Sequence, residues 1–124
     1  MNTNKAVDVV QAYLDASYES DVEKMSQVFH DDAHILGHNK KGLLSDMNKQ
    51  AFLELVKSSA PGSSDPNFQR QDNIISIDMT SEHTAVARVE VRIGNILFTD
   101  ILCLIYLEGE WFIISKVYSG RPLS

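Results

Sequence analysis

Residues 83–119, HTAVARVEVRIGNILFTDILCLIYLEGEWFIISKVYS, decide the fold. Their apolar side chains recur with a period of two, as in β-strands, and two short turn signals interrupt them. The signals are Gly94-Asn95 and the three residues 108–110. Both are short enough for hairpins, so we expect three consecutive antiparallel strands over residues 83–93, 96–107 and 111–119.

The preceding part of the chain is mostly helical in pattern. Apolar residues at helical spacing predict a first helix from Ala6 to Tyr18. A capping box of Ser20 and Glu23 predicts a second helix that ends near His30, and Asn48 can cap a third. With single strands over residues 33–38 and 73–79, the order is ααβαββββ. We therefore expect one α+β domain over residues 1–124, with three helices packed on a curved, mostly antiparallel sheet.

The expected turns sort the strand residues into two faces. Pairing Ile93 with Ile96, and Leu107 with Trp111, puts Arg88 and Glu90 on the concave, pocket side with Ile101, Cys103 and Ile105. The opposite face is also apolar, so we expect a second copy of the chain to cover it. The predicted homodimer interface is Leu102, Leu104, Tyr106, Phe112, Ile114 and Tyr118. Asp100 and Lys116 fall on this face and are interpreted as an interface ion pair.

Composition excludes several classes of protein. A net charge of −6 lacks the basic surface that nucleic acids require. No stretch reaches the roughly 18 uninterrupted apolar residues of a membrane span, and the N-terminus lacks the apolar core of a signal peptide. The single Cys103 lies in an apolar run, which favours a reducing compartment, and we expect a cytoplasmic protein.

Histidines recur at positions 30, 34 and 38, a spacing that would suit a metal site on one helix. In a strand, however, His34 and His38 would lie about 13 Å apart and could not share an ion. We therefore expect no metal and no cofactor. His34 and His38 remain candidate catalytic groups together with Tyr13, because imidazole titrates near neutral pH.

Three short motifs carry a family resemblance. They are Phe29-His30-Asp31-Asp32-Ala33, Phe98-Thr99-Asp100 and the terminal run from Trp111 to Val117. In this order the chain resembles the nuclear transport factor 2-like superfamily, and within it the subgroup called putative lumazine-binding. The resemblance implies a cystatin-like cone with a central pocket, and extends more distantly to ketosteroid isomerases and SnoaL-like polyketide cyclases.

The isomerase resemblance can be followed residue by residue. Tyr13 stands where those enzymes have an oxyanion-binding tyrosine. Gly37 occupies the position of the carboxylate that acts as the base in those enzymes. Cys103 occupies the position of the protonated aspartic acid that donates the second hydrogen bond to the oxyanion. The resemblance therefore implies that steroid isomerisation is disfavoured, because both carboxyl groups are missing.

We expect a small-molecule-binding domain with an apolar pocket and a polar end. Arg88 would hold a ligand carboxylate there, unless Glu90 neutralises it. The alternatives are an isomerase, dehydratase or cyclase that uses His or Tyr in the cone, and a protein-interaction module. The predicted pocket residues are Tyr13, Phe29, Phe52, Arg88, Glu90, Ile101, Cys103, Ile105 and Trp111.

Overall fold

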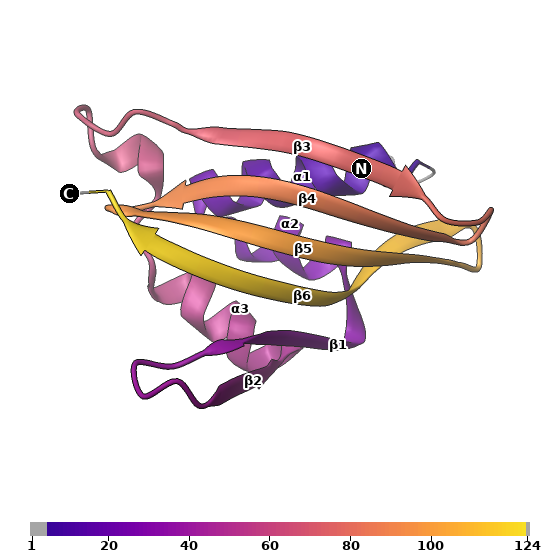
Figure 1. Cartoon of the computed structure of the whole chain (residues 1–124). Coiled ribbons are helices and arrows are strands. Elements are labelled where there is room, and N and C mark those ends of the chain that lie inside the picture. Colours follow the sequence, from indigo (N-terminus) through magenta and orange to yellow (C-terminus); the bar gives the residue numbers. More distant parts are fainter. Residues whose placement is uncertain (1–4, 124) are drawn as a thin grey trace.

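The computed structural model describes residues 5–123 and shows helices packed against one face of a curved, open sheet (Figure 1). The helices are α1 (Ala6–Glu19), α2 (Val22–Val28) and α3 (Lys49–Ser58), and a short 3-10 helix, η1 (Gly62–Ser64), follows α3. The strands are β1 (Phe29–His38), β2 (Leu44–Asn48), β3 (Asp72–Met79), β4 (Thr84–Ile93), β5 (Ile96–Leu107) and β6 (Glu110–Pro122). The predicted α+β class is confirmed. Among the helices described, none is long and apolar enough to cross a membrane.

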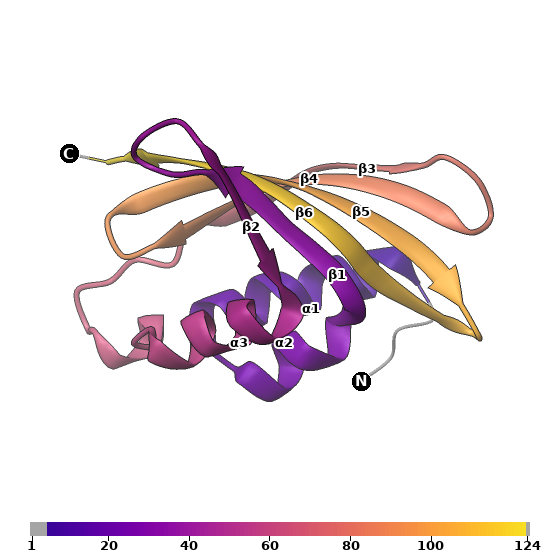
Figure 2. The same ribbon diagram turned by 90° about the horizontal axis from the view of Figure 1, so that it is seen from below.

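One sheet contains all six strands, in the order β2-β1-β6-β5-β4-β3. Neighbouring strands are antiparallel except β1 and β6, which run parallel. The helices lie together on one side of this sheet, as Figure 2 shows. We call the side that they cover the inner face and the other side the outer face.

The helix starts differ in one detail from the prediction. Asn48 caps α3 as expected, since its side chain accepts a hydrogen bond of 2.8 Å from the backbone N–H of Ala51. The cap of α2 is Asp21, which accepts from the N–H of Lys24, whereas Ser20 ends α1 in a left-handed conformation. The observed N-cap of α2 is therefore one residue later than the predicted Ser20.

The strand β2 was not predicted. Its five residues alternate between exposed and half-buried, and Leu44 is 71% exposed, so the segment lacks the apolar pattern of an interior strand. It pairs antiparallel with β1 at the edge of the sheet. β1 itself begins at Phe29, earlier than expected.

The turn between β5 and β6 contains two residues, not three. Glu108 and Gly109 both have positive φ (51° and 86°), the conformation of the tight turns that suit twisted hairpins. Leu107 therefore pairs with Glu110, and Ile105 with Phe112. A bulge at Ile114 then restores the predicted register, in which Asp100 pairs with Tyr118.

The helices cover the face opposite to the one predicted. The side chains of β4 and β5 divide into two groups as expected, but Ala85, Ala87, Val89, Leu102 and Leu104 are each at most 2% exposed and form the core under the helices. The predicted dimer interface is therefore wrong for Leu102 and Leu104, which are buried under the helices, whereas Phe112 and Ile114 of the same predicted set are half-buried. Charged Arg88 cannot be buried under helices without a partner, so it lies on the exposed outer face.

Gly37 provides a test of packing on the inner face. A Cβ at this position would lie 2.5 Å from the ring of Tyr118. We predict that Gly37→Ala lowers the free energy of unfolding by about 1–3 kcal/mol through overpacking, measured by urea denaturation. In a Tyr118→Leu background the same change should cost much less. Equal losses in both backgrounds would contradict this account of the contact.

Candidate functional site

A cavity of about 240 Å³ opens to solvent at one end of the cone. It lies where the C-terminal ends of α1 and α3 approach the β4–β5 turn, and we call it the cone cavity. Most of its walls are apolar, and Lys116 of β6 supplies the one charged side chain among its lining residues. The lining residues are Ser17, Ser20, Met25, Phe52, Leu55, Val56, Ser59, Ile93, Ile96, Phe98 and Lys116.

Lys116 is buried, with 7% of its surface exposed. Its Nζ lies over three aromatic rings, 4.5 Å from the ring centre of Phe52, 5.1 Å from Tyr13 and 5.5 Å from Tyr118. Within residues 5–123 it has no hydrogen bond and no ion pair. Burial lowers the pKa of Lys116, while the nearby Asp100 acts in the opposite direction. The ring faces stabilise the ammonium, but they do not replace the hydrogen bonds that it loses with water.

Asp100 is the second buried charged residue of the cone, with no exposed surface. Its Oδ2 accepts a hydrogen bond of 2.5 Å from the hydroxyl of Tyr13, while its Oδ1 has no partner in the part of the chain that the structure describes. Burial, and then the neighbouring Asp100, raise the pKa of Tyr13 well above its ordinary value. Tyr13 therefore keeps its proton and acts as a hydrogen-bond donor.

The two charged groups lie diagonally on adjacent strands. Asp100 pairs with Tyr118, and Lys116 pairs with Leu102, two residues further along β5. Within residues 5–123 the two side chains form no ion pair, since their charged atoms are more than 4.0 Å apart. The cone therefore holds a buried acceptor, Oδ1 of Asp100, and a donor at the cavity wall, Nζ of Lys116, that do not satisfy each other. Of the two residues Lys116 lines the cavity, so its Nζ can donate to a polar atom of a ligand.

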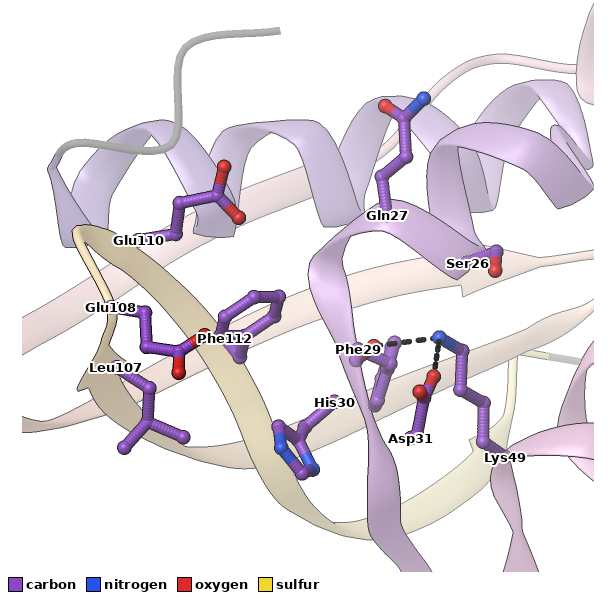
Figure 3. A pocket seen from close by; sticks show the side chains of 10 residues that line it. All are labelled: Ser26, Gln27, Phe29, His30, Asp31, Lys49, Leu107, Glu108, Glu110 and Phe112. Atoms are coloured by element: carbon purple, nitrogen blue, oxygen red, sulfur yellow. Dashed lines mark hydrogen bonds and ion pairs between the residues drawn. The ribbon is translucent and has the colours of Figure 1, made fainter.

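A larger cleft of about 920 Å³ opens beside the β5–β6 turn (Figure 3). Its polar groups are largely exposed or already paired. Lys49 donates to the backbone oxygen of Phe29 (2.9 Å) and to Asp31 (3.0 Å), and the carboxyl groups of Glu108 and Glu110 belong to exposed residues. The Lys49 contact lowers the pKa of Asp31. Because this cleft offers no buried group in need of a partner, we place the candidate site in the cone cavity.

The predicted pocket residues divide between the two faces of the sheet. Phe52 lines the cone cavity, and Tyr13 lies beside it. Phe29 packs in the core between them, with ring centres 5.9 Å from Tyr13 and 5.2 Å from Phe52. Trp111 is buried at the opposite end of β5, against Tyr106.

The other predicted pocket residues lie on the outer face. Ile101 is 42% exposed, and Arg88, its neighbour on β4, is also exposed. The predicted Arg88 anchor was therefore wrong, since its guanidinium faces solvent and not a cavity. Of the predicted pocket residues Phe52 alone lines the cone cavity. Those on the outer face are Arg88, Glu90, Ile101, Cys103 and Ile105.

The candidate histidines lie outside the cone as well. His34 is exposed and contacts Asp46 through Nδ1 at 3.0 Å, and His38 is exposed and contacts the backbone oxygen of Asn39. Among the described residues neither side chain forms a hydrogen bond with Tyr13, whose hydroxyl donates to Asp100. In the described part of the chain no group of three or more His, Cys, Asp and Glu residues is arranged to hold a metal ion.

The isomerase comparison also needs correction. Cys103 was matched with the carboxyl group that shares an oxyanion with the tyrosine, yet Cys103 is half-buried on the outer face. The carboxyl group that contacts Tyr13 is that of Asp100. Lys116 and Asp100 were thus missed as site residues. The available signal was their charge within strands of apolar residues, at positions that share a face with Leu102 and Leu104.

Removal of one hydroxyl tests the buried hydrogen bond. We predict that Tyr13→Phe lowers the free energy of unfolding by about 1–3 kcal/mol, because it leaves both oxygens of Asp100 without a partner. Tyr118→Phe is the matched control, since it removes a hydroxyl with no hydrogen bond among the described residues, and it should change stability by less than about 0.5 kcal/mol. Equal effects in urea denaturation would contradict the assigned role of Tyr13.

Comparisons with known proteins agree with this fold. An NTF2-like protein of unknown function from Shewanella baltica OS155 is 26% identical, with a TM-score of 0.83 over 94% of this chain and 90% of that one. A second such protein, from Methylobacillus flagellatus KT, is 30% identical, with a TM-score of 0.73 over 93% and 88% of the chains. A ketosteroid isomerase-like protein from Erwinia carotovora atroseptica SCRI1043 shares the fold at 18% identity, with a TM-score of 0.69 over 92% of each chain.

A search of curated proteins found no match. The family model described as "Putative lumazine-binding" matches residues 2–119, nearly the whole chain. The resemblance inferred from the sequence motifs is therefore confirmed, and the chain belongs to the putative lumazine-binding family of NTF2-like proteins.

Proposed function

We propose that this protein binds a small molecule in the cone cavity, with Lys116 donating a hydrogen bond to a ligand oxygen. The observation that carries the proposal is the buried Lys116 ammonium, which lines a cavity and has no hydrogen bond within residues 5–123. A buried charge without hydrogen bonds is costly, and a ligand acceptor would offset that cost.

The cavity limits the size and shape of the ligand. At about 240 Å³ it is smaller than the sites of drug-sized molecules, which are roughly 300–1,000 Å³. Phe52 and Phe98 offer ring surfaces to a flat molecule. A compound of one or two rings fits this description, and lumazine, which the family description mentions, is a two-ring molecule with carbonyl oxygens.

The charges favour a neutral carbonyl over a carboxylate. Lys116 and Asp100 carry opposite formal charges, so a ligand carboxylate would bring a second negative charge into a buried space. A carbonyl oxygen accepts from Nζ without that cost. The expected carboxylate-bearing ligand is therefore replaced in this proposal by one with a carbonyl group.

Lumazine itself is a suitable first probe. We predict that it raises the melting temperature of the wild type in a concentration-dependent way, and that native mass spectrometry detects the complex. Lys116→Met should lose the temperature shift because it removes the donor. Arg88→Met, a matched loss of charge on the outer face, should keep it.

Two outcomes would contradict the proposed site. Equal temperature shifts in the two variants would show that lumazine binds elsewhere. The absence of any shift or complex in the wild type, for lumazine and for a panel of one- and two-ring carbonyl compounds, would contradict binding in the cone cavity.

We also propose that two copies of the chain associate through the outer face. Ile101 and Val117 pair across β5 and β6 and are 42% and 43% exposed, and no described helix covers them (Figure 2). Half-buried apolar side chains extend this surface to both sides, and a patch of this kind favours association. They are Val86, Cys103, Ile105, Phe112 and Ile114.

Charge complementarity favours a second copy as the partner. Arg88 and Glu90 lie on the same strand and face, beside the apolar residues, and carry opposite charges. In a two-fold symmetric contact the same pair of residues meets twice, once in each direction. Arg88 of each copy can therefore contact Glu90 of the other copy.

Substitution on this face tests the association. We predict a dimer by light scattering at micromolar concentration for the wild type, and a monomer for Ile101→Glu, which buries an unpaired charge in the contact. Val7→Glu, at a 46% exposed position of α1, is the control and should stay dimeric. A monomeric wild type would overturn this part of the proposal.

A further inference from the structure

We propose that Lys116 binds its ligand covalently, as an imine formed with an aldehyde or ketone. This inference rests on the proposed function, since it uses the same cavity and the same carbonyl group. It adds a reaction that hydrogen bonding alone does not require.

The surroundings of Lys116 suit a nucleophilic amine. A lysine becomes nucleophilic when an apolar pocket removes water from it, and Lys116 is buried among Phe52, Tyr13 and Tyr118 at the cavity wall. Within residues 5–123 no acceptor holds its Nζ in a hydrogen bond, so the nitrogen is free to approach a carbonyl carbon. The lowered pKa of Lys116 agrees with this geometry. Lys49, by contrast, donates to two oxygens.

The steps balance with protons from Lys116 itself and from water at the cavity. The Lys116 ammonium first gives a proton to water, and the neutral amine attacks the carbonyl carbon, so that a C–N bond forms and the carbonyl electron pair moves to oxygen. The proton that the nitrogen then loses passes to this oxygen, and the proton first given to water returns to the resulting hydroxyl, which leaves as water while the nitrogen electron pair forms the C=N bond. Lysine ammonium and carbonyl compound thus give protonated imine and water, with no change of oxidation state. Asp100 acts on the charge of Lys116 from beyond ion-pair distance, so it stabilises the cation and does not take the proton directly.

The product fits the site as well as the free amine does. A protonated imine carries the same single positive charge as the ammonium that it replaces. That charge remains over the rings of Phe52, Tyr13 and Tyr118 and near the carboxyl group of Asp100. A carboxylate ligand could not form this bond, which is a second reason to expect an aldehyde or ketone.

Reductive trapping tests the inference on the intact protein. The protein is incubated with benzaldehyde and sodium cyanoborohydride, which converts an imine to a stable benzylamine, and the modified lysine is identified by peptide mass mapping. We expect modification of Lys116 at least about tenfold faster than of any other lysine, and loss of this preference in urea. Lys116→Arg should remove the fast modification, and Lys49→Arg should leave it unchanged.

The pH dependence separates a buried amine from an exposed one. Because burial lowers the pKa of Lys116, its trapping rate should reach a plateau at lower pH than that of exposed lysines. The titratable groups that face Lys116 are Asp100 from β5, Tyr13 from α1 and Tyr118 from β6. Tyr13→Phe should therefore shift this plateau, whereas Lys49→Arg should not.

The outcomes distinguish this inference from the proposed function. If lumazine raises the melting temperature but benzaldehyde modifies surface lysines and spares Lys116, the imine is excluded and binding in the cone cavity stands. If Lys116 is trapped selectively, the inference is supported. If neither lumazine nor benzaldehyde engages the cavity, both proposals fail.

Discussion

The burial of the Lys116 ammonium inside an apolar cone is the constraint on which the rest of this site depends. Removing such a group from water is unfavourable unless the surrounding structure compensates for it. Here three ring faces, from Phe52, Tyr13 and Tyr118, and the nearby Asp100 provide partial compensation. The compensation stays incomplete in the part of the chain described, because Oδ1 of Asp100 is buried there without a hydrogen-bond partner and Nζ of Lys116 donates no hydrogen bond to the protein.

Several features of the fold position this group. Gly37 leaves the space that the Tyr118 ring occupies, and Tyr118 in turn lies beside Lys116. The bulge at Ile114 sets the register that turns Lys116 inward, opposite Leu102. Asn48 begins α3 at the residue that brings Phe52 over the ammonium. Residues that are distant in the sequence thus act on one side chain, and the same packing that stabilises the cone shapes its cavity.

The sequence predicted the fold better than the site. Alternation identified the strands of the β4–β6 meander and grouped their side chains correctly on β4 and β5, because the period of two is set by the backbone. It did not indicate which group faces the helices, since both are apolar. The charges of Arg88 and Glu90 indicate the solvent side of the sheet. Because these two residues were assigned to the pocket, Lys116 and Asp100 on the other face were interpreted as a dimer-interface ion pair. Edge strand β2 was not predicted because its side chains are mostly polar or exposed. The contact between Tyr13 and Asp100 was not predicted because the two residues are far apart in the sequence.

The central claim is that Lys116 is a largely buried amine that forms no hydrogen bond with the described part of the protein. A titration of its side chain by NMR tests this claim most directly. In protein labelled with ¹³C and ¹⁵N on lysine, the Lys116 signal is assigned by its absence in Lys116→Met. The account predicts a pKa of Lys116 below the ordinary lysine value of 10.5. A pKa of Lys116 at or above that value, or a direct ion pair with Asp100 in the spectra, would contradict it.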